Sequence, residues 1–154
     1  MNPNKFTHKS LEAIQSAQDM SLSYQNNCTE QEHLLYALLN DEGGVVPQLL
    51  TKMGIDASAV KTAALKFVEG MSRVSGGGRE AGKVYVSSEL NAALVEAEAQ
   101  AERMKDDYVS VEHIFLALVE KPGSGTAGIF KSFGITKDKV LKALSEVRGS
   151  QRVT

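Results

Sequence analysis

The chain contains the same helical segment twice, eighty residues apart. The stretch "EQEHLLYALLND", residues 30–41, reappears as "SVEHIFLALVEK", residues 110–121, with a Glu-His pair and an Ala-Leu pair at matching places. Further apolar positions keep this offset over about sixty residues without a gap: Ala13, Ile14 and Ala17 align with Ala93, Leu94 and Ala97, and Met53-Gly54-Ile55 with Phe133-Gly134-Ile135. One register over that length predicts a duplicated unit.

The apolar spacing predicts four helices in each unit and no substantial sheet. In the first unit, one helix runs from about residue 7 to 23, and the next carries leucines at the i, i+1, i+4 and i+5 positions of a buried stripe. A third helix ends at Met53, and a fourth places apolar residues from 60 to 71, Phe67 and Met71 among them, at helical spacing. The predicted fold class is all-α, with two pseudo-twofold-related four-helix repeats packed into one globular domain.

Residues near the expected helix ends support these boundaries. Thr7 and Ser87 are good N-cap residues for the two copies of the first helix, and Asp56 and Thr136 for the fourth. Gly54 is predicted to end the third helix, because glycine adopts a left-handed conformation without a Cβ penalty. The expected division is a first repeat over about 6–70, a glycine-rich linker over about 72–85, a second repeat over about 86–147, and the start of a connector over 148–154.

Composition and charge exclude several classes of partner. The net charge is −2 and no block of Lys and Arg stands out, so we expect no nucleic-acid partner. No apolar run approaches the roughly 18 residues that span a membrane, and the N-terminus has no apolar core typical of a signal peptide. The single cysteine, Cys28, cannot form an internal disulfide, which fits a reducing cytoplasm. These features favour a cytoplasmic protein without membrane partners.

Motifs for catalysis, metals and cofactors are incomplete. Residues 77–84, "GGREAGKV", nearly match a phosphate-binding loop, but Val84 replaces the hydroxyl residue that holds Mg²⁺. His33 and His113 each follow a glutamate, and neither has a second histidine four residues along the same helix. They are expected to be helix-surface or hydrogen-bonded residues, and no nucleophile lies in a recognisable elbow motif. We therefore predict no metal, no cofactor and no catalysis by this chain.

Glutamates that recur at 32 and 112 allow two interpretations. Residues 29–32, "TEQE", fit a capping box in which Thr29 caps the second helix. The second copy has Val109 at that place, and Ser110 can cap from one position later. An acid in the first turn is also favoured by the helix dipole. The functional alternative is that two carboxylates, related by pseudo-symmetry, accept charged or hydrogen-bonding groups of a partner.

Several of these motifs together resemble the amino-terminal domain of Clp/Hsp100-type AAA+ chaperones. The resemblance is carried by Phe6-Thr7, by "TEQEHLLYALL" and "SVEHIFLALV", by the helix-ending Gly-Ile pairs and by the eighty-residue duplication. The closing "KALSEVRGSQRVT" resembles the junction into the first ATPase module of the ClpB-type disaggregases within that family. The resemblance covers nearly the whole chain.

The resemblance implies a recognition module rather than an enzyme. In that family the domain consists of two pseudo-twofold-related repeats, lies on a linker above a hexameric AAA+ ring and binds unfolded or aggregated polypeptides or adaptors. In the disaggregase branch the ring works with the DnaK chaperone system, and all ATP chemistry lies in later modules. A recognition module for many unrelated chains is expected to bind through apolar surface with a few adaptable polar groups, at micromolar affinity or weaker, about −8 kcal/mol.

Two other functions stay open at this level. In ClpC-type domains the Glu of the Glu-His motif and a Thr that opens the first helix form a pocket for phosphorylated arginine in each repeat. Thr7 with Glu32, and Ser87 with Glu112, match that pattern, whereas Gln31 and Val111 stand where ClpC-type sequences place a small hydroxyl residue. The other possibility is a stand-alone adaptor built from the same repeats.

The predicted polypeptide-binding site is a surface groove between the halves. Thr7 and Ser87 begin equivalent helices, and Glu32 and Glu112 begin another equivalent pair, so these four should form two matching hydroxyl–carboxylate pairs. Asp106 and Tyr108 lie in the loop before the second copy of the Glu-His helix and can reach the same edge. The site residues predicted from the sequence are Thr7, Glu32, Ser87, Asp106, Tyr108 and Glu112.

Overall fold

Eight α-helices build the part of the fold that the structure describes. The computed structural model describes residues 2–74 and 85–149, and over these residues it contains no strand, only isolated bridges. After a 3-10 turn at Pro3–Lys5, the helices are α1 (His8–Ser23), α2 (Gln31–Asn40), α3 (Val45–Lys52), α4 (Ala57–Glu69), α5 (Ser88–Arg103), α6 (Val111–Glu120), α7 (Ser124–Phe133) and α8 (Lys137–Arg148). The all-α prediction is confirmed. The near-match to a phosphate-binding loop, residues 77–84, lies outside the described residues.

The two repeats correspond helix by helix. α5 and α6 begin and end eighty positions after α1 and α2, and α7 and α8 follow the pattern of α3 and α4. Even an unusual backbone conformation is repeated: Gln25 and Lys105, also eighty apart, have φ values of 55° and 59°. A side chain with a Cβ adopts this left-handed conformation at a cost, so its presence at both places shows that the loop after the first helix has one shape in both repeats.

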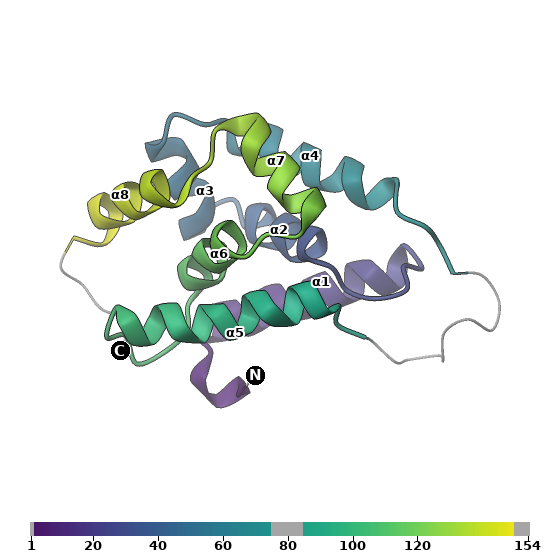
Figure 1. Ribbon diagram of the computed structural model, residues 1–154, viewed down its shortest axis with the longest axis horizontal. Coiled ribbons are helices and arrows are strands. Elements are labelled where there is room, and N and C mark those ends of the chain that lie inside the picture. The colour runs from purple at the N-terminus through teal and green to yellow at the C-terminus, as the bar shows by residue number, and fades with distance from the viewer. Residues whose placement is uncertain (1, 75–84, 150–154) are drawn as a thin grey trace.

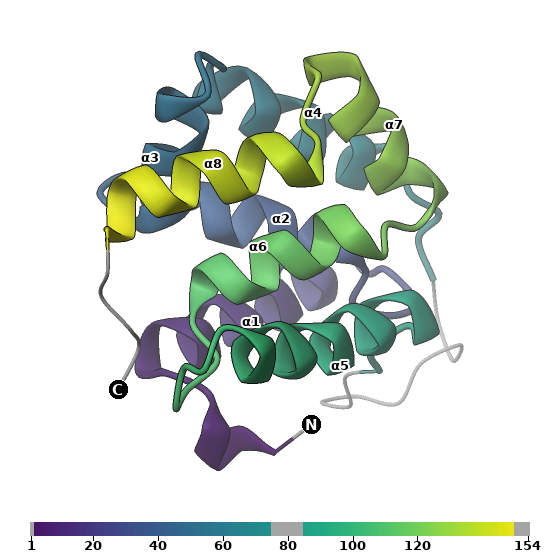
Figure 2. The same ribbon diagram turned by 60° about the vertical axis from the view of Figure 1, so that its left-hand side comes forward.

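The helices form three layers (Figures 1 and 2). α1 and α5 lie along one side, α2 and α6 run through the middle, and the remaining four helices cover the other side. Contacts between the repeats come in symmetric pairs. α3 of the first repeat packs against α8 of the second, and their counterparts α7 and α4 pack against each other in the same way. The repeats therefore share one core, as the sequence predicts.

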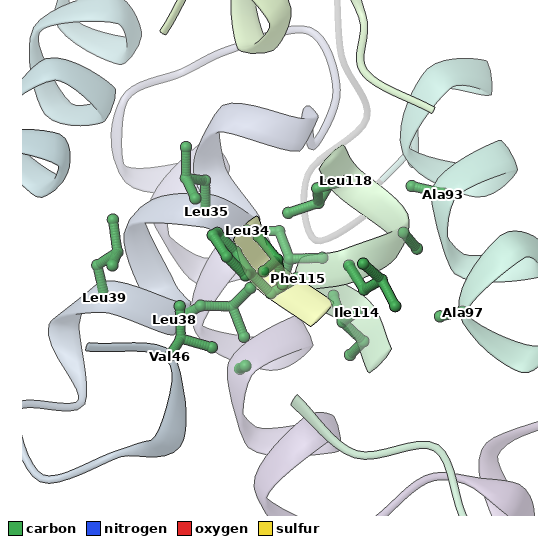
Figure 3. Packing of buried hydrophobic residues seen from close by; sticks show 14 of the residues in the cluster. Leu34, Leu35, Leu38, Leu39, Val46, Ala93, Ala97, Ile114, Phe115 and Leu118 are labelled. Atoms are coloured by element: carbon green, nitrogen blue, oxygen red, sulfur yellow. The ribbon is translucent and has the colours of Figure 1, made fainter. Parts of the chain in front are cut away.

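The core lies where the two central helices cross. Figure 3 shows Leu34 and Leu38 of α2 beside Phe115 of α6. The equivalent residues Leu38 and Leu118 are 3% and 0% exposed, as the duplication predicts. Burial of such side chains contributes roughly 1.5–3 kcal/mol each, so this crossing holds the repeats together.

Short arms before the first helix of each repeat are exchanged between the repeats. The first arm, residues 5–7, lies parallel to the segment at Val109, and the second arm, residues 85–87, lies parallel to the segment at Thr29. The amide of Thr7 donates to the carbonyl of Val109 (2.9 Å), and the amide of Ser87 donates to the carbonyl of Thr29 (3.0 Å). Each first helix therefore starts against the second helix of the other repeat.

Most predicted helix ends are confirmed. Thr7, Ser87, Asp56 and Thr136 cap their helices through side-chain oxygens, and Gly54 has a φ of 75° after α3.

The capping box predicted at residues 29–32 is wrong. α2 begins one residue later, with Glu30 as its N-cap. Thr29 is instead buried, and its hydroxyl bonds that of Ser21 (2.8 Å). The periodicity of the fourth helix also misplaces Phe67, whose side chain is 42% exposed.

Candidate functional site

The exchanged arms bring each predicted hydroxyl to the opposite repeat. Thr7 meets the segment that leads into α6, and Ser87 meets the segment that leads into α2. The first arm thus lies beside the helix that carries Glu112, and the second beside the helix that carries Glu32. The hydroxyl residue of each arm therefore lies beside the segment before the glutamate-bearing helix of the other repeat, and not beside that of its own repeat.

In the second repeat, the carboxylates are bound by groups of the protein itself. The Arg148 Nη2 donates to Asp106 Oδ1 at 2.6 Å, and its Nε lies 3.9 Å from Glu112 Oε2. The other Asp106 oxygen is 2.6 Å from His113 Nε2. We call these four residues the second-repeat carboxylate site. The hydrogen bond with Asp106 raises the pKa of the Arg148 guanidinium, which stays fully charged.

His113 is a neutral hydrogen-bonding residue of this site. The backbone N–H of Ser110 donates to His113 Nδ1 (2.8 Å), so the ring proton resides on Nε2 and is donated to Asp106. Burial lowers the pKa of His113 below its ordinary value of 6.5, although the hydrogen bond with Asp106 opposes the shift. The ring thus caps α6 and orients Asp106 in a single interaction chain.

The first repeat has the same framework with different polar groups. The amide of Glu30 donates to His33 Nδ1 (2.9 Å), and His33 Nε2 lies 2.7 Å from Asn26 Oδ1. Asn26 thus replaces Asp106 as the partner of the histidine. The position of Arg148 corresponds to Val68, which is buried in the core. No arginine is therefore built in at this place in the first repeat.

Glu32 is held by the second repeat. The Thr126 hydroxyl of α7 donates to Glu32 Oε2 at 3.0 Å, and both residues are buried. Burial raises the pKa of the Glu32 carboxyl above 4.5, since removing the ionised form from water outweighs its hydrogen bonds. Glu32 is thus the carboxylate of the pair without an arginine partner in the described structure.

A hollow of about 280 Å³ opens beside Glu32 at the junction of the repeats. Its lining combines the acids Glu30, Glu32 and Glu89 with the apolar Phe67 and Met71, and includes no Lys or Arg among the described residues. Gly125 lies against it so closely that an added Cβ would come within 2.3 Å of the Phe67 ring and 2.5 Å of Glu32. We call this the first-repeat hollow.

Gln31 ties the repeats together next to this hollow. Its amide nitrogen donates to the carbonyls of Glu89 and Lys121, both at 2.9 Å, and its oxygen accepts from the amide of Gly123, also at 2.9 Å. The Gln31 side chain itself is 2% exposed, so its amide depends on these protein partners. Gln31 is therefore a structural clamp between repeats.

The structure places the predicted site residues at different depths. Glu32, Asp106 and Glu112 are only 6%, 9% and 7% exposed, because each packs where the repeats or their helices meet. Tyr108 is 43% exposed and presents an aromatic surface at this edge. Thr7 and Ser87 are half-buried caps. Of the six predicted residues, only Glu32 lines the first-repeat hollow.

Sequence reasoning missed Arg148, Gln31 and Asn26. One signal for the first was available: Arg148 stands eighty positions after Val68, so a charged residue replaces an apolar one in an otherwise apolar register. Both buried histidines were expected among helix-surface or hydrogen-bonded residues, and their hydrogen-bonded role is the one that the structure shows.

Over residues 2–74 and 85–149, no group of three or more His, Cys, Asp and Glu side chains is arranged to hold a metal ion. None of the helices described there combines the length and apolar character needed to cross a membrane.

Comparison with known proteins identifies relatives along the whole chain. The family model described as the Clp repeat N-terminal domain matches residues 5–133 and again residues 88–152. The chaperone protein ClpB of Bacillus anthracis is 40% identical over 154 residues, and that of Nitratidesulfovibrio vulgaris is 43% identical over 155 residues. All of this chain is covered in both, whereas it spans 18% of the length of each relative.

Solved structures share the fold at low sequence identity. The Hsp104 N-terminal domain from Candida albicans has a TM-score of 0.83 at 22% identity, covering 97% of this chain and 95% of that one. A complex of the ClpV N-domain with VipB peptide has a TM-score of 0.74 at 20% identity, covering 98% and 91%. At such identity the likeness concerns the fold alone.

Proposed function

Because this chain belongs to the Clp repeat N-terminal domain family, we propose that it is the polypeptide-recognition module of an ATP-driven disaggregase or unfoldase. It would bind unfolded or aggregated chains weakly and deliver them to a hexameric AAA+ ring elsewhere in the protein, in cooperation with the DnaK chaperone system. The similarity to ClpB chaperones extends over all of this chain, which spans 18% of their length, and it supports this role. The ClpV N-domain, a structural relative, forms a complex with VipB peptide.

One structural observation carries the proposal: large apolar side chains are exposed on the second arm, in the loop that meets the first arm, and beside Glu32. Tyr85 and Val86 of the second arm are 48% and 38% exposed, and Phe67 beside Glu32 is 42% exposed. Tyr108, in the loop that meets the first arm, is 43% exposed. An unfolded chain offers apolar side chains and backbone groups, so such edges bind it without a rigid pocket. Release into a ring requires weak binding, at micromolar dissociation constants or weaker, about −8 kcal/mol.

Within this proposal the sequence-predicted residues have different tasks. Tyr108 would contact the polypeptide directly, since its ring is exposed. Thr7 and Ser87 would fix the arms by capping, and Glu32 would contribute charge to the hollow. Asp106 and Glu112 would shape the edge from below, because Arg148 already binds them.

Phosphoarginine recognition of the ClpC type is the weaker alternative. The lining of the first-repeat hollow carries three carboxylates and no described Lys or Arg, so a phosphate group would meet like charges there. A stand-alone adaptor is also less well supported, because the relatives are about five times longer than this chain.

A titration followed by NMR tests the proposal. A permanently unfolded model protein is added to the isotope-labelled chain, and Tyr108→Ser and Phe67→Ser are compared with the parent. The expected result is a loss of affinity of about fivefold or more for each variant, measured on protein whose amide spectrum shows it to be folded. Val95→Ser is the matched control, because Val95 is 51% exposed on α5. Equal affinity for all four proteins, or saturable binding of free phosphoarginine instead, would contradict the proposal.

A further inference from the structure

We infer that Arg148 is a built-in ligand of the second-repeat carboxylate site, and that it determines specificity by keeping basic side chains of a bound polypeptide away from Asp106 and Glu112. The inference deepens the proposed function and rests on it only in taking the external ligand to be a polypeptide.

Arg148 is held as a ligand is held in a binding site. Its side chain is 10% exposed, and its Nη2 and Nε face the carboxylates of two different segments, the loop before α6 and the first turn of α6. It projects from the last residue of α8, a helix whose Val140, Ala143 and Leu144 belong to the apolar core. The guanidinium therefore bridges α8 to the loop that exposes Tyr108.

The first repeat shows the same framework without an arginine. Val68 occupies the position of Arg148, and Asn26 replaces Asp106. Glu32, the counterpart of Glu112, faces a hollow instead of a guanidinium. The duplication thus supplies an internal comparison: the same backbone is open to a cation in one repeat and filled by one in the other.

An incoming arginine or lysine would compete with Arg148 for the same oxygens. A guanidinium matches carboxylates through its planar fork of donors, so another guanidinium is the group best able to replace it. The internal group is always present, and a site that is open for only a small fraction of the time binds its ligand more weakly by that same fraction. Arg148 therefore lowers the affinity of the second repeat for basic residues.

The experiment removes the internal ligand and asks whether an external one enters. Arg148→Gln and the parent are titrated with the acetylated, amidated peptide Gly-Arg-Gly, and amide shifts around Glu112 are followed by NMR. The expected result is tighter binding at the second repeat by about tenfold, which corresponds to a site that is about 90% closed in the parent. The same peptide with citrulline, the neutral isostere of arginine, should show no gain.

Two further variants keep the test decisive. Asp106→Asn combined with Arg148→Val copies the first repeat, removes the buried aspartate charge and leaves Glu112 open, so it serves if Arg148→Gln fails to fold. Arg103→Gln is the matched control, because Arg103 is 57% exposed and its guanidinium pairs with Glu96, not with Asp106 or Glu112. Unchanged affinity for the arginine peptide in both Arg148 variants, or an equal gain for the citrulline peptide, would overturn the inference.

The outcomes separate this inference from the proposed function. If the arginine peptide gains affinity but an unfolded protein binds neither parent nor variant, the carboxylate site is confirmed and polypeptide recognition is wrong. If the unfolded protein binds the parent and the arginine peptide gains nothing, recognition stands and the role assigned to Arg148 falls.

Discussion

The two repeats have the same backbone and different chemistry. The exchanged arms, the left-handed residues Gln25 and Lys105 and the buried histidines recur eighty positions apart. At two equivalent positions, however, the residues differ. The first repeat has Asn26 where the second has Asp106, and Val68 where the second has Arg148. In the second repeat an arginine binds the buried carboxylates, whereas in the first repeat Glu32 lies beside the first-repeat hollow.

The contrast between the repeats shows which positions of a duplicated fold are constrained. The equivalent helices α2 and α6 pack against each other in the core, so both keep large aliphatic or aromatic residues at their crossing. Polar positions at the edges need only have their charges and hydrogen bonds satisfied, and each repeat achieves this in its own way. The duplication thus preserved the scaffold and allowed two unlike edges.

The largest expected effect comes from breaking the arginine bridge. Arg148→Gln should lower the free energy of unfolding by about 3 kcal/mol, because the buried Asp106 carboxylate loses its guanidinium. Adding Asp106→Asn should recover most of this loss, since the pair then resembles Asn26 and His33 of the first repeat. Urea unfolding of the parent, single and double variants measures both changes. If the double variant is no more stable than the single one, the repeats are not equivalent in the way described.

A smaller effect is expected at the clamp. Gln31→Val copies Val111, the counterpart residue of the second repeat, and leaves the carbonyls of Glu89 and Lys121 and the amide of Gly123 without this partner. The expected cost is about 2 kcal/mol, within the range for unsatisfied buried groups. Thermal unfolding measures it, and Val111→Gln is the reciprocal control. A neutral result for Gln31→Val would show that water replaces the clamp.

The two helix caps should lose similar amounts. Thr7→Ala and Ser87→Ala each remove the side-chain oxygen that accepts from the backbone of the first turn, at 3.2 Å and 3.0 Å respectively. The expected cost is about 1 kcal/mol for each, and the sum for the double variant, because the caps share no contact. Urea unfolding of the parent, the two single variants and the double variant measures these costs. A loss of stability confined to one variant would show that the two arms contribute unequally.

The smallest effect is a change in pH dependence. Burial raises the pKa of Glu32 above 4.5, so the folded chain holds this proton more tightly than the unfolded chain. Stability therefore falls as the pH rises from 4.5 through the folded pKa, and the cost of burying the charge is complete above it. Glu32→Gln, which can still accept from Thr126, should remove this slope and leave neutral-pH stability equal or slightly higher.

The counterpart Glu112→Gln provides the control. It removes a charge that faces Arg148, and it should lower neutral-pH stability by about 0.5–1 kcal/mol. Tm values from pH 4 to 8 for both variants test the pair. A parallel profile for parent and Glu32→Gln would contradict the interpretation of the buried glutamate.

The sequence predicts the scaffold well but not the burial of the candidate site carboxylates, for a physical reason. The signals for the scaffold are local ones: helix periodicity, Gly54 and caps such as Thr7. The eighty-residue repeat supports them, because many recur at the equivalent position of the other repeat. The environment of Glu32 depends on Thr126, ninety-four positions later. That of Asp106 depends on Arg148, forty-two positions later. Contacts between such distant segments have no local pattern, so the predicted surface carboxylates proved to be buried ones.

The exchanged arms also restrict the order in which this chain folds during synthesis. The Ser10 hydroxyl of α1 donates to the carbonyl of Val109, ninety-nine positions later, so α1 cannot complete its bonds until the ribosome has made α5 and the loop after it. Phe6, which is 5% exposed in the finished fold, forms its backbone bridge with the same Val109. A nascent first repeat must wait for the second, because each half carries the segment that completes the other.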